Sequence, residues 1–416
     1  MTKCNLPEVV VTGVGVTASI GQGKEDFASS LLSGRHAFDV MKRSGRQKDS
    51  RFIGAEIASL SYPDRLSKKM LRKASFSSRA ALVTLTEAWE EAELDDADSS
   101  RIGLVVGGSN FQQRENFEVY ERYQDRSGFI SPAYGLSFMD SDLCGICTDQ
   151  FGITGLAYTV GGASASGQQL AVIHAIQQVL SGEVDTCIAL GALMDLSYME
   201  CEALRALGAM GTDKYADEPE NACRPFDQNR DGFIYGESCG ALVIERKETA
   251  LRRGLKPYAA LSGWSIKLDG NRNPDPSLEG EIHVIQKALE RARLLPEDID
   301  YINPHGTGSF IGDEIELKAL RACRLSHAYI NATKSITGHG LSAAGIVEII
   351  SVLLQMKKSA LHPSRNLDHP IDDSFHWVNE KSISYRIKNA LSLSMGFGGM
   401  NTAVCIQNIE KCGGES

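Results

Sequence analysis

Apolar and polar positions repeat along this chain with two different periods. Short runs rich in apolar and β-branched residues predict buried strands, and longer stretches with an apolar residue about every 3.6 positions predict helices. The predicted strands are residues 9–12, 102–106, 156–160, 186–190, 242–244, 258–261, 328–330 and 391–393, and the clearest predicted helices are residues 79–94, 279–294 and 346–356. Strands that alternate with helices in this way predict a layered α/β fold.

Residues 156–180 combine a strand, a run of small residues and an apolar helix. Glycine and alanine occupy positions 161–163 and 165, so Ser164 is predicted to lie where the strand turns sharply into the helix. Such an elbow exposes a nucleophile, and the backbone amides that begin the helix can bind developing negative charge. Ser164 is therefore the candidate centre of chemistry. The alternative is that the small residues only allow the helix to pack closely on the strand.

Length and composition indicate a soluble globular protein of two domains or of one duplicated unit. The chain has 416 residues, of which 42% are hydrophobic and 23% are charged. A polar, basic segment at residues 245–257 separates two stretches that each begin with a strand, so we predict domains at residues 1–255 and 256–416. No secretory segment and no apolar run long enough to cross a bilayer is present, which favours the cytoplasm.

The ten cysteines lie in apolar surroundings, which favours buried thiols over disulfides. Cys144 and Cys147 form one CxxC pair without a second pair at the spacing of a zinc site, so we expect no metal. Residues 227–232 copy the start of a calcium loop, but its twelfth position is Ser238 instead of a glutamate. Gly13 and the following small residues match a dinucleotide-binding spacing, yet no helix opens cleanly there, and we predict a tight structural turn.

A net charge of −10 argues against nucleic acid as the main partner. One local basic stripe stands out against this charge, because its five members follow the spacing of one helical face. They are Arg65, Lys68, Lys69, Arg72 and Lys73. The stripe predicts a docking site for an acidic partner, and the alternative is an ordinary solvated face.

Two histidines stand in glycine-rich loops that follow predicted strands. His305 lies in NPHGTGS and His339 in KSITGHGLSAAG, and the small neighbours of both allow a ligand to approach. They are the candidate catalytic partners of Ser164.

With these residues in place, the whole chain resembles the β-ketoacyl synthase family of the thiolase superfamily. The resemblance rests on five blocks in order: TGVGVTASIG from Thr12, RPFDQNRDGFIYGES from Arg224, HGTGSFIGDEIE from His305, KSITGHGLSAAG from Lys334 and GFGGMN from Gly396. It implies a thiolase-like five-layered α/β/α/β/α sandwich of two similar halves. It also implies a homodimer without cofactor that acts on thioesters carried by an acyl carrier protein.

The resemblance further assigns roles to individual residues. His305 and His339 would donate hydrogen bonds to the thioester carbonyl, and Phe397 would gate the site. The backbone amides of Ser164 and Phe397 would match the family's oxyanion site. Lys334, Asp313, Glu316 and Glu348 would form the polar network that supports these loops. The basic stripe together with Arg205 would receive the carrier protein.

One departure from the family pattern decides the predicted chemistry. Where the family carries a nucleophilic cysteine, this chain reads GASASG, so Ser164 stands in the place of the cysteine. A thiol has a pKa of ~8.5, whereas an alcohol resembles water, with a pKa of ~15.7. This difference corresponds to on the order of 10 kcal/mol. A helix N-terminus supplies at most ~2 kcal/mol, so position alone does not make Ser164 the equivalent of a thiolate.

Without that nucleophile, the other half of the family's reaction remains. Malonyl-phosphopantetheine on a carrier protein would lose CO₂, and the two histidines would stabilise the enolate oxygen. This resembles the malonyl carrier-protein decarboxylases of bacillaene-type polyketide β-branching cassettes, whose acetyl product feeds a hydroxymethylglutaryl synthase-like enzyme. The alternatives are a 3-oxoacyl carrier-protein synthase that uses Ser164 and a non-catalytic partner subunit akin to chain-length factors.

Overall fold

The computed structural model describes residues 8–162, 165–272 and 275–409. Its described strands form one large twisted sheet that divides into two halves, joined where β1 and β10 pair through Val10 and Ala260. The first half holds β6 (Ala157–Val160), β5 (Ile102–Gly107), β7 (Thr186–Gly191), β9 (Ser238–Arg246) and β1 (Val9–Ala18), with β2 (Gly21–Gln22) beside β1. The second holds β10 (Ala259–Leu268), β17 (Met400–Asn408), β16 (Asn389–Gly396), β11 (Tyr301–Asn303), β12 (Tyr329–Ile330) and β14 (His376–Trp377).

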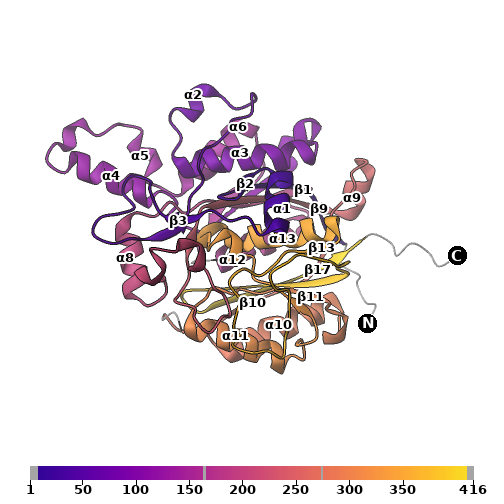
Figure 1. The fold of residues 1–416 in the computed structure, drawn as a ribbon. Helices are drawn as coiled ribbons and strands as arrows, with labels where there is room; N and C mark the ends of the chain where they lie inside the picture. Colours follow the sequence, from indigo (N-terminus) through magenta and orange to yellow (C-terminus); the bar gives the residue numbers. More distant parts are fainter. Residues whose placement is uncertain (1–7, 163–164, 273–274, 410–416) are drawn as a thin grey trace.

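Helices cover both halves of the sheet and fill the space between them (Figure 1). The outer layers are α3 (Phe76–Glu91) with α6 (Ser141–Phe151), and α10 (Leu278–Ala292) with α11 (Phe310–Ala322). The middle layer is α7 (Ser166–Ser181) with α13 (Ala344–Lys358). The predicted five-layered α/β/α/β/α sandwich is therefore confirmed.

The remaining elements lie in the connections. The short helices are α1 (Lys24–Ser33), α2 (Lys68–Leu71), α4 (Gln113–Tyr123), α5 (Tyr134–Ser137), α8 (Tyr198–Ala206), α9 (Lys247–Arg252) and α12 (Lys334–Thr337). Two small sheets are formed by β3 (Phe38–Val40), β4 (Ile53–Ala55) and β8 (Tyr235–Gly236), and by β13 (Ala360–Leu361) with β15 (Ile383–Ser384). Among the described helices, none combines the length and apolar character needed to span a bilayer.

The two halves repeat the same strand pairing. From the junction outward, β1, β9 and β7 pair antiparallel, and β7, β5 and β6 pair parallel. The second half follows the same order, because β10, β17 and β16 pair antiparallel and β16, β11 and β12 pair parallel. In both halves, the strand that forms the junction carries a register shift, which follows Val11 in β1 and Leu261 in β10. This shared pattern confirms two similar halves, whereas the boundary at residue 255 stays a prediction.

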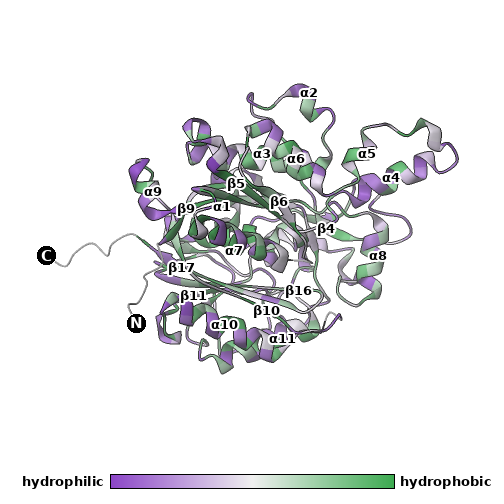
Figure 2. Ribbon diagram, turned by 180° about the vertical axis from the view of Figure 1, so that it is seen from behind, coloured by the Kyte–Doolittle hydropathy of each residue, from purple (hydrophilic) through white to green (hydrophobic). Residues whose placement is uncertain are grey.

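The middle helices are buried on nearly every side. In α13 all residues from Ala344 to Met356 are buried, and α7 packs against strands of both halves of the sheet. Figure 2 shows α7 as a largely hydrophobic helix between the two halves. Continuous burial explains why the hydrophobic pattern of residues 346–356 is so dense.

Two local predictions were wrong. Gly13 and Gly15 do not form a turn but lie inside the long strand β1. A Cβ added at either glycine would collide with backbone carbonyls of α3, so these glycines allow the helix to lie directly on the strand. The basic stripe is not one helical face either, since α2 spans only Lys68–Leu71 and Arg65 precedes it.

Candidate active site

The structure brings the two predicted histidines together from different elements. His305 follows β11, and His339 follows α12. Their ring centroids lie 5.6 Å apart with the planes nearly perpendicular, at 82°. Both side chains line one cavity, so a single small group in it can meet both rings.

The loop of His305 is fixed at its backbone by charged side chains. Glu316 on α11 accepts hydrogen bonds from the amides of His305 (2.6 Å) and Gly306 (2.9 Å). Lys334 Nζ donates to the carbonyl oxygen of His305 from the opposite side. The backbone of His305 is thus held at both its amide and its carbonyl, which leaves the ring to face the cavity.

Asp313 and Glu348 complete the predicted supporting network. Asp313 Oδ1 accepts from the amides of Thr307 and Gly308, each at 3.1 Å, and its Oδ2 accepts from the Phe226 amide at 2.7 Å. Glu348 on α13 pairs with Lys334, and both side chains are 2% exposed. Burial raises the pKa of Glu348 to about 7 and that of Asp313 to about 6, against the stabilising effect of these partners.

The tautomer of His339 follows from its own loop. The Leu341 amide donates to His339 Nδ1 at 3.2 Å, so Nδ1 is an acceptor and the ring proton resides on Nε2. The Phe233 ring packs edge-on against the imidazole at 5.1 Å. His339 therefore presents Nε2–H as a hydrogen-bond donor.

Both imidazoles are neutral near pH 7. Burial, reinforced by the nearby Lys334 ammonium, lowers the pKa of His305 and of His339 well below the ordinary value of 6.5, and His339 adds to the effect on His305. The buried Nδ1 of His305 has no hydrogen-bond partner within the described part of the chain. Neutral rings of this kind donate hydrogen bonds well but are weak bases.

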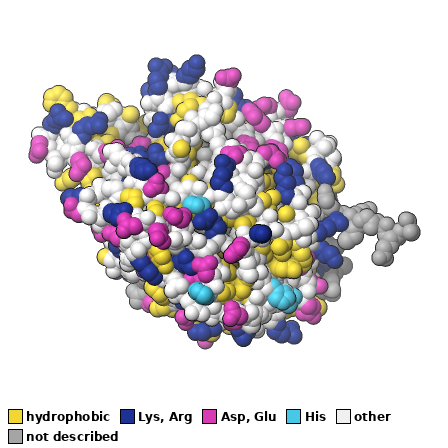
Figure 3. Space-filling view, viewed as in Figure 1, with side chains coloured by type: hydrophobic (Ala, Val, Ile, Leu, Met, Phe, Trp, Pro, Cys, Tyr) yellow, Lys and Arg dark blue, Asp and Glu magenta, His cyan; other side chains and the backbone are white. Residues whose placement is uncertain are grey.

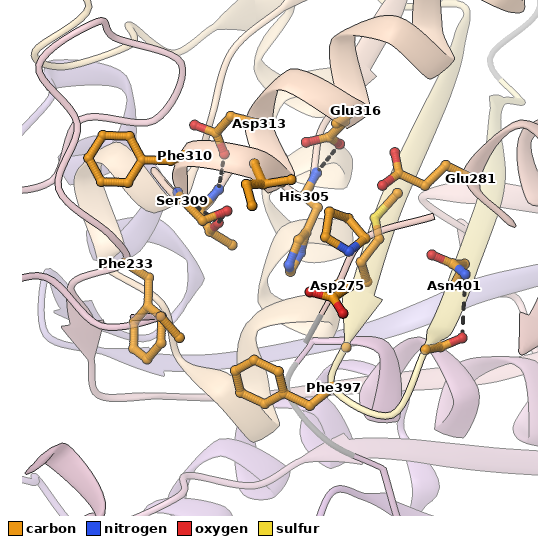
Figure 4. A pocket seen from close by; sticks show the side chains of 18 of the residues that line it. Phe233, Asp275, Glu281, His305, Ser309, Phe310, Asp313, Glu316, Phe397 and Asn401 are labelled. Atoms are coloured by element: carbon orange, nitrogen blue, oxygen red, sulfur yellow. Dashed lines mark hydrogen bonds between the residues drawn. The ribbon is translucent and has the colours of Figure 1, made fainter. Parts of the chain in front are cut away.

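The histidines open into a cavity of about 310 Å³, within the usual size range of small-ligand sites. Figure 4 shows His305 between Glu316 and the aromatic ring of Phe397. Phe397 lies in the turn between β16 and β17 and lines the cavity, and its gating role stays a prediction. The other walls include Phe233, Thr307, Phe310, Ile311, Met395 and Asn401.

Ala163 and Ser164 lie outside the described residues, whereas Gly162 and Ala165 on either side of them are described. Ala165, the next residue, lies at the start of α7 beside Gly345, where an added Cβ would collide with the Ala165 carbonyl. Gly345 belongs to the first turn of α13, directly after the loop of His339. Gly162 has φ of 150°, and a Cβ there would come within 2.6 Å of Gly167. Gly162 and Gly345 thus each allow close packing against the start of α7, and Gly345 does so directly after the histidine loop.

Glu281 was missed by the sequence analysis. It lies on α10, is 1% exposed, and lines the same cavity. Burial raises the pKa of Glu281 well above its ordinary value, and the carboxyls of Glu316, Asp269 and Asp313 raise it further. A signal was available, because position 281 shares a helical face with the buried residues Val284, Ile285 and Ala288. An acidic residue on an otherwise apolar helical face would have identified Glu281 as a candidate functional residue.

The predicted docking residues fall into two groups. Lys68, Lys69, Arg72 and Lys73 are exposed around α2, and Figure 3 shows basic side chains gathered there, at the top of the molecule. By contrast, Arg65 is ion-paired with Asp95 at 2.7 Å. Arg205 on α8 is ion-paired with Asp213 at 2.8 Å, and Figure 1 draws α8 well apart from α2. Within one chain the exposed basic patch therefore consists of the four residues around α2.

The motifs that we set aside have structural uses. Asp227 accepts hydrogen bonds from Arg224 and from the amides of Asn229 and His369. Cys144 is buried on α6, which raises the pKa of its thiol to about 11. The eight cysteines of the described chain are all buried free thiols, as predicted. Within this part of the chain, no cluster of three or more histidine, cysteine or acidic side chains is arranged to hold a metal.

Comparison with known proteins agrees with this geometry. Two family models match: the N-terminal domain of β-ketoacyl synthases over residues 7–250 and the C-terminal domain over residues 258–368. A 3-oxoacyl-[acyl-carrier-protein] synthase 1 of Buchnera aphidicola is 31% identical over 96% of this chain and 99% of its own length. A 3-oxoacyl-[acyl-carrier-protein] synthase 2 of Staphylococcus aureus is 30% identical over 97% of this chain and 98% of its own.

Solved structures give the same result at the level of the fold. A type II polyketide synthase ketosynthase, in complex with its acyl carrier protein and bound to the hexaketide, matches with a TM-score of 0.87. It shares 25% identity, and the match covers 97% of this chain and 100% of that one. The ishigamide ketosynthase/chain length factor matches with a TM-score of 0.86 at 23% identity, over 97% and 99% of the two chains. The chain therefore belongs to the β-ketoacyl synthase family.

Proposed function

We propose that this protein decarboxylates malonyl-S-acyl carrier protein to acetyl-S-acyl carrier protein. The observation that carries the proposal is the pair of neutral imidazoles that line one cavity, with their ring centroids 5.6 Å apart. Loss of CO₂ from a malonyl thioester places negative charge on the thioester oxygen. Hydrogen-bond donors aimed at that oxygen lower the barrier, and removal of one such donor typically costs about 10²–10³ in rate.

The histidines also bear on the role of position 164. An alcohol needs a general base before it can accept an acyl group. Both histidines have a pKa well below the ordinary value, so neither is an effective base for a serine hydroxyl near pH 7. The chemistry of the sequence and the electrostatics of the cavity therefore both favour decarboxylation without an acyl-enzyme.

The second candidate is a condensing enzyme that uses Ser164. It is favoured by the names of the curated relatives, which are 3-oxoacyl-[acyl-carrier-protein] synthases. A covalent acyl group on Ser164, detected by intact-protein mass spectrometry, would support it.

The test is to incubate the protein with malonyl carrier protein and to follow the mass of the carrier. We expect loss of CO₂ without acylation of the protein itself. His305→Ala and His339→Ala should each lower the rate by about 10²–10³. His376→Ala is the matched control, because His376 is exposed on β14. Ser164→Cys should restore self-acylation. A carrier whose mass never changes would overturn the proposal.

By the same proposal the enzyme acts as a homodimer and supplies acetyl carrier protein to a hydroxymethylglutaryl synthase-like enzyme of polyketide β-branching. Size-exclusion chromatography with light scattering tests the dimer. Turnover in the presence of such a synthase tests the second step, since product transfer should then depend on this protein.

A further inference from the structure

The proposed reaction consumes one proton, and the two histidines are poor sources of it. Each holds its ring proton as a neutral imidazole, and transfer of that proton would leave an imidazolate beside a newly formed product. Protonation of the enolate carbon therefore calls for a different acid at the same cavity.

Five carboxyl side chains line the cavity: Asp269, Asp275, Glu281, Asp313 and Glu316. Three of them accept hydrogen bonds from the protein, and a fourth is exposed to solvent. Both oxygens of Asp313 and of Glu316 accept backbone amides. Asp269 accepts from Asn401 Nδ2 at 2.8 Å, and Asp275 is exposed to solvent.

The carboxyl of Glu281 differs from these four. It takes part in no hydrogen bond or ion pair of the described chain, and its buried Oε2 has no partner. Figure 4 shows the Glu281 carboxyl beside Glu316, which accepts the hydrogen bond of the His305 amide. A buried carboxyl without a donor is stable only in its protonated form, in which it carries an acidic O–H.

The surroundings keep this proton in place. The charged groups facing Glu281 are Asp269 at the end of β10 and Asp313 and Glu316 on α11, and all of them disfavour a second negative charge. Two cations act on the neighbouring carboxyls, Lys334 on Glu316 and Arg230 on Asp313. Lys334 is paired with Glu348, and Arg230 donates hydrogen bonds to the carbonyl oxygens of Ser309 and Phe310. The N-terminus of α10 acts in the opposite direction, but a helix end shifts a pKa by at most about 1.5 units.

We propose that Glu281 is the catalytic acid that protonates the acetyl enolate, directly or through one water molecule. This inference rests on the proposed decarboxylase function. The bond between the carboxylate carbon and the α-carbon breaks, CO₂ leaves, and the electron pair stays on the enolate. The α-carbon then takes the proton of Glu281, the acetyl thioester forms, and solvent water returns a proton to the carboxylate.

The experiment compares Glu281→Gln with the control Glu279→Gln, which changes an exposed residue of the same helix. Malonyl carrier protein is the substrate, and the rate of acetyl carrier protein formation is measured between pH 6 and 10. We expect Glu281→Gln to lower kcat by about 10²–10⁴ with little change in KM, and Glu279→Gln to match the wild type. Wild-type kcat should fall as pH rises through the raised pKa of Glu281, and Glu281→Gln should lose this dependence.

Two further measurements separate proton donation from a packing role. Glu281→Asp keeps an acid but disturbs packing more than glutamine does, so it should retain more activity than Glu281→Gln. Glu281→Ala should recover activity when formate is added. Equal rates for wild type and Glu281→Gln with the same pH profile would overturn this inference alone. A wild-type protein that releases no CO₂ would overturn the proposed function together with the inference.

Discussion

At the scale of single residues, the backbone of the site decides what its side chains can do. The Leu341 amide fixes the proton of His339 on Nε2, and Glu316 with Lys334 holds the peptide of His305 at both ends. These contacts are made by the protein alone, so the donors are positioned before any substrate binds. Such preorganisation avoids a reorganisation cost during the reaction.

Lys334 provides a first test of this positioning. Lys334→Met removes the ammonium that binds both the His305 carbonyl and Glu348. We expect decarboxylation to fall by about 10-fold or more, since misplacement of a donor costs rate even when the donor remains. The pKa of both histidines should rise toward the ordinary value, because the ammonium that lowers it is gone. NMR titration of the histidine ring protons measures this shift, and an unchanged titration would contradict the assigned role.

Glu348 predicts how stability depends on pH. Burial raises its pKa from 4.5 to about 7, so the folded protein binds this proton more tightly than the unfolded chain does. The stabilisation is fully present below pH 4.5 and is lost as pH rises through about 7, and it amounts to on the order of 3 kcal/mol. Glu348→Gln should flatten the decline of the unfolding free energy over this window. Urea titrations of both proteins at several pH values test the prediction, and parallel curves would contradict it.

At the scale of elements, glycines bring helices unusually close to the strands beneath them. Gly13 and Gly15 in β1 face carbonyls of α3, and Gly263 in β10 faces a carbonyl of α10. The same device therefore recurs in both halves, next to the register shift of each long strand. Close approach of helix and strand removes more apolar surface from water than a bulkier residue would allow.

Gly15→Ala tests this packing. Its Cβ would meet the backbone of Thr84, which cannot move without shifting α3, so we expect a loss of about 1–3 kcal/mol in unfolding free energy. Gly145→Ala in the middle of α6 is the control, because an added Cβ there meets nothing within 4 Å. That change should stabilise the protein by about 0.5–1 kcal/mol. Equal effects of the two changes would contradict the close-packing account.

These elements also show how far the sequence could lead. Periodicity located β5 and β7 and most of α3, α10 and α13, because buried faces impose it on the residues. It wrongly predicted a turn at Gly13, which lies inside β1. In the sequence, a glycine that makes room for a packed helix looks the same as a glycine that forms a turn. Glu281 was not identified from the sequence, because its raised pKa depends on burial and on carboxyls that follow β10 or lie on α11. Only the fold brings these carboxyls near it. The histidine pair was recognisable because the glycine-rich loops around it are local features of the sequence.

At the scale of the whole molecule, charge is distributed unevenly. The chain has a net charge of −10, yet the exposed basic residues Lys68, Lys69, Arg72 and Lys73 gather around α2. A patch of this kind attracts an acidic partner, whereas the acidic remainder of the protein surface repels that partner. A related ketosynthase is solved in complex with its own acyl carrier protein, and in the function that we propose for this chain the carrier is the partner of the patch.

Charge reversal tests the patch. Lys68→Glu combined with Lys69→Glu should raise KM for malonyl carrier protein several-fold at low salt, and the difference should shrink as salt increases. The kcat at saturation and the rate with malonyl-pantetheine should stay unchanged, because neither depends on protein docking. Lys287→Glu, an exposed residue of α10, is the control and should behave as the wild type. An equal loss with malonyl-pantetheine would contradict a docking role.

The wholly buried middle layer has a consequence for expression of the two halves as separate polypeptides. A fragment that ends near residue 255 keeps α7 but loses α13, which packs against it, and the complementary fragment keeps α13 without α7. Each fragment would then expose a hydrophobic helix to water and would tend to aggregate when produced alone. Made in one cell, the two pieces should instead reassemble, so a split version of this enzyme would work as a reporter of proximity for proteins fused to each piece.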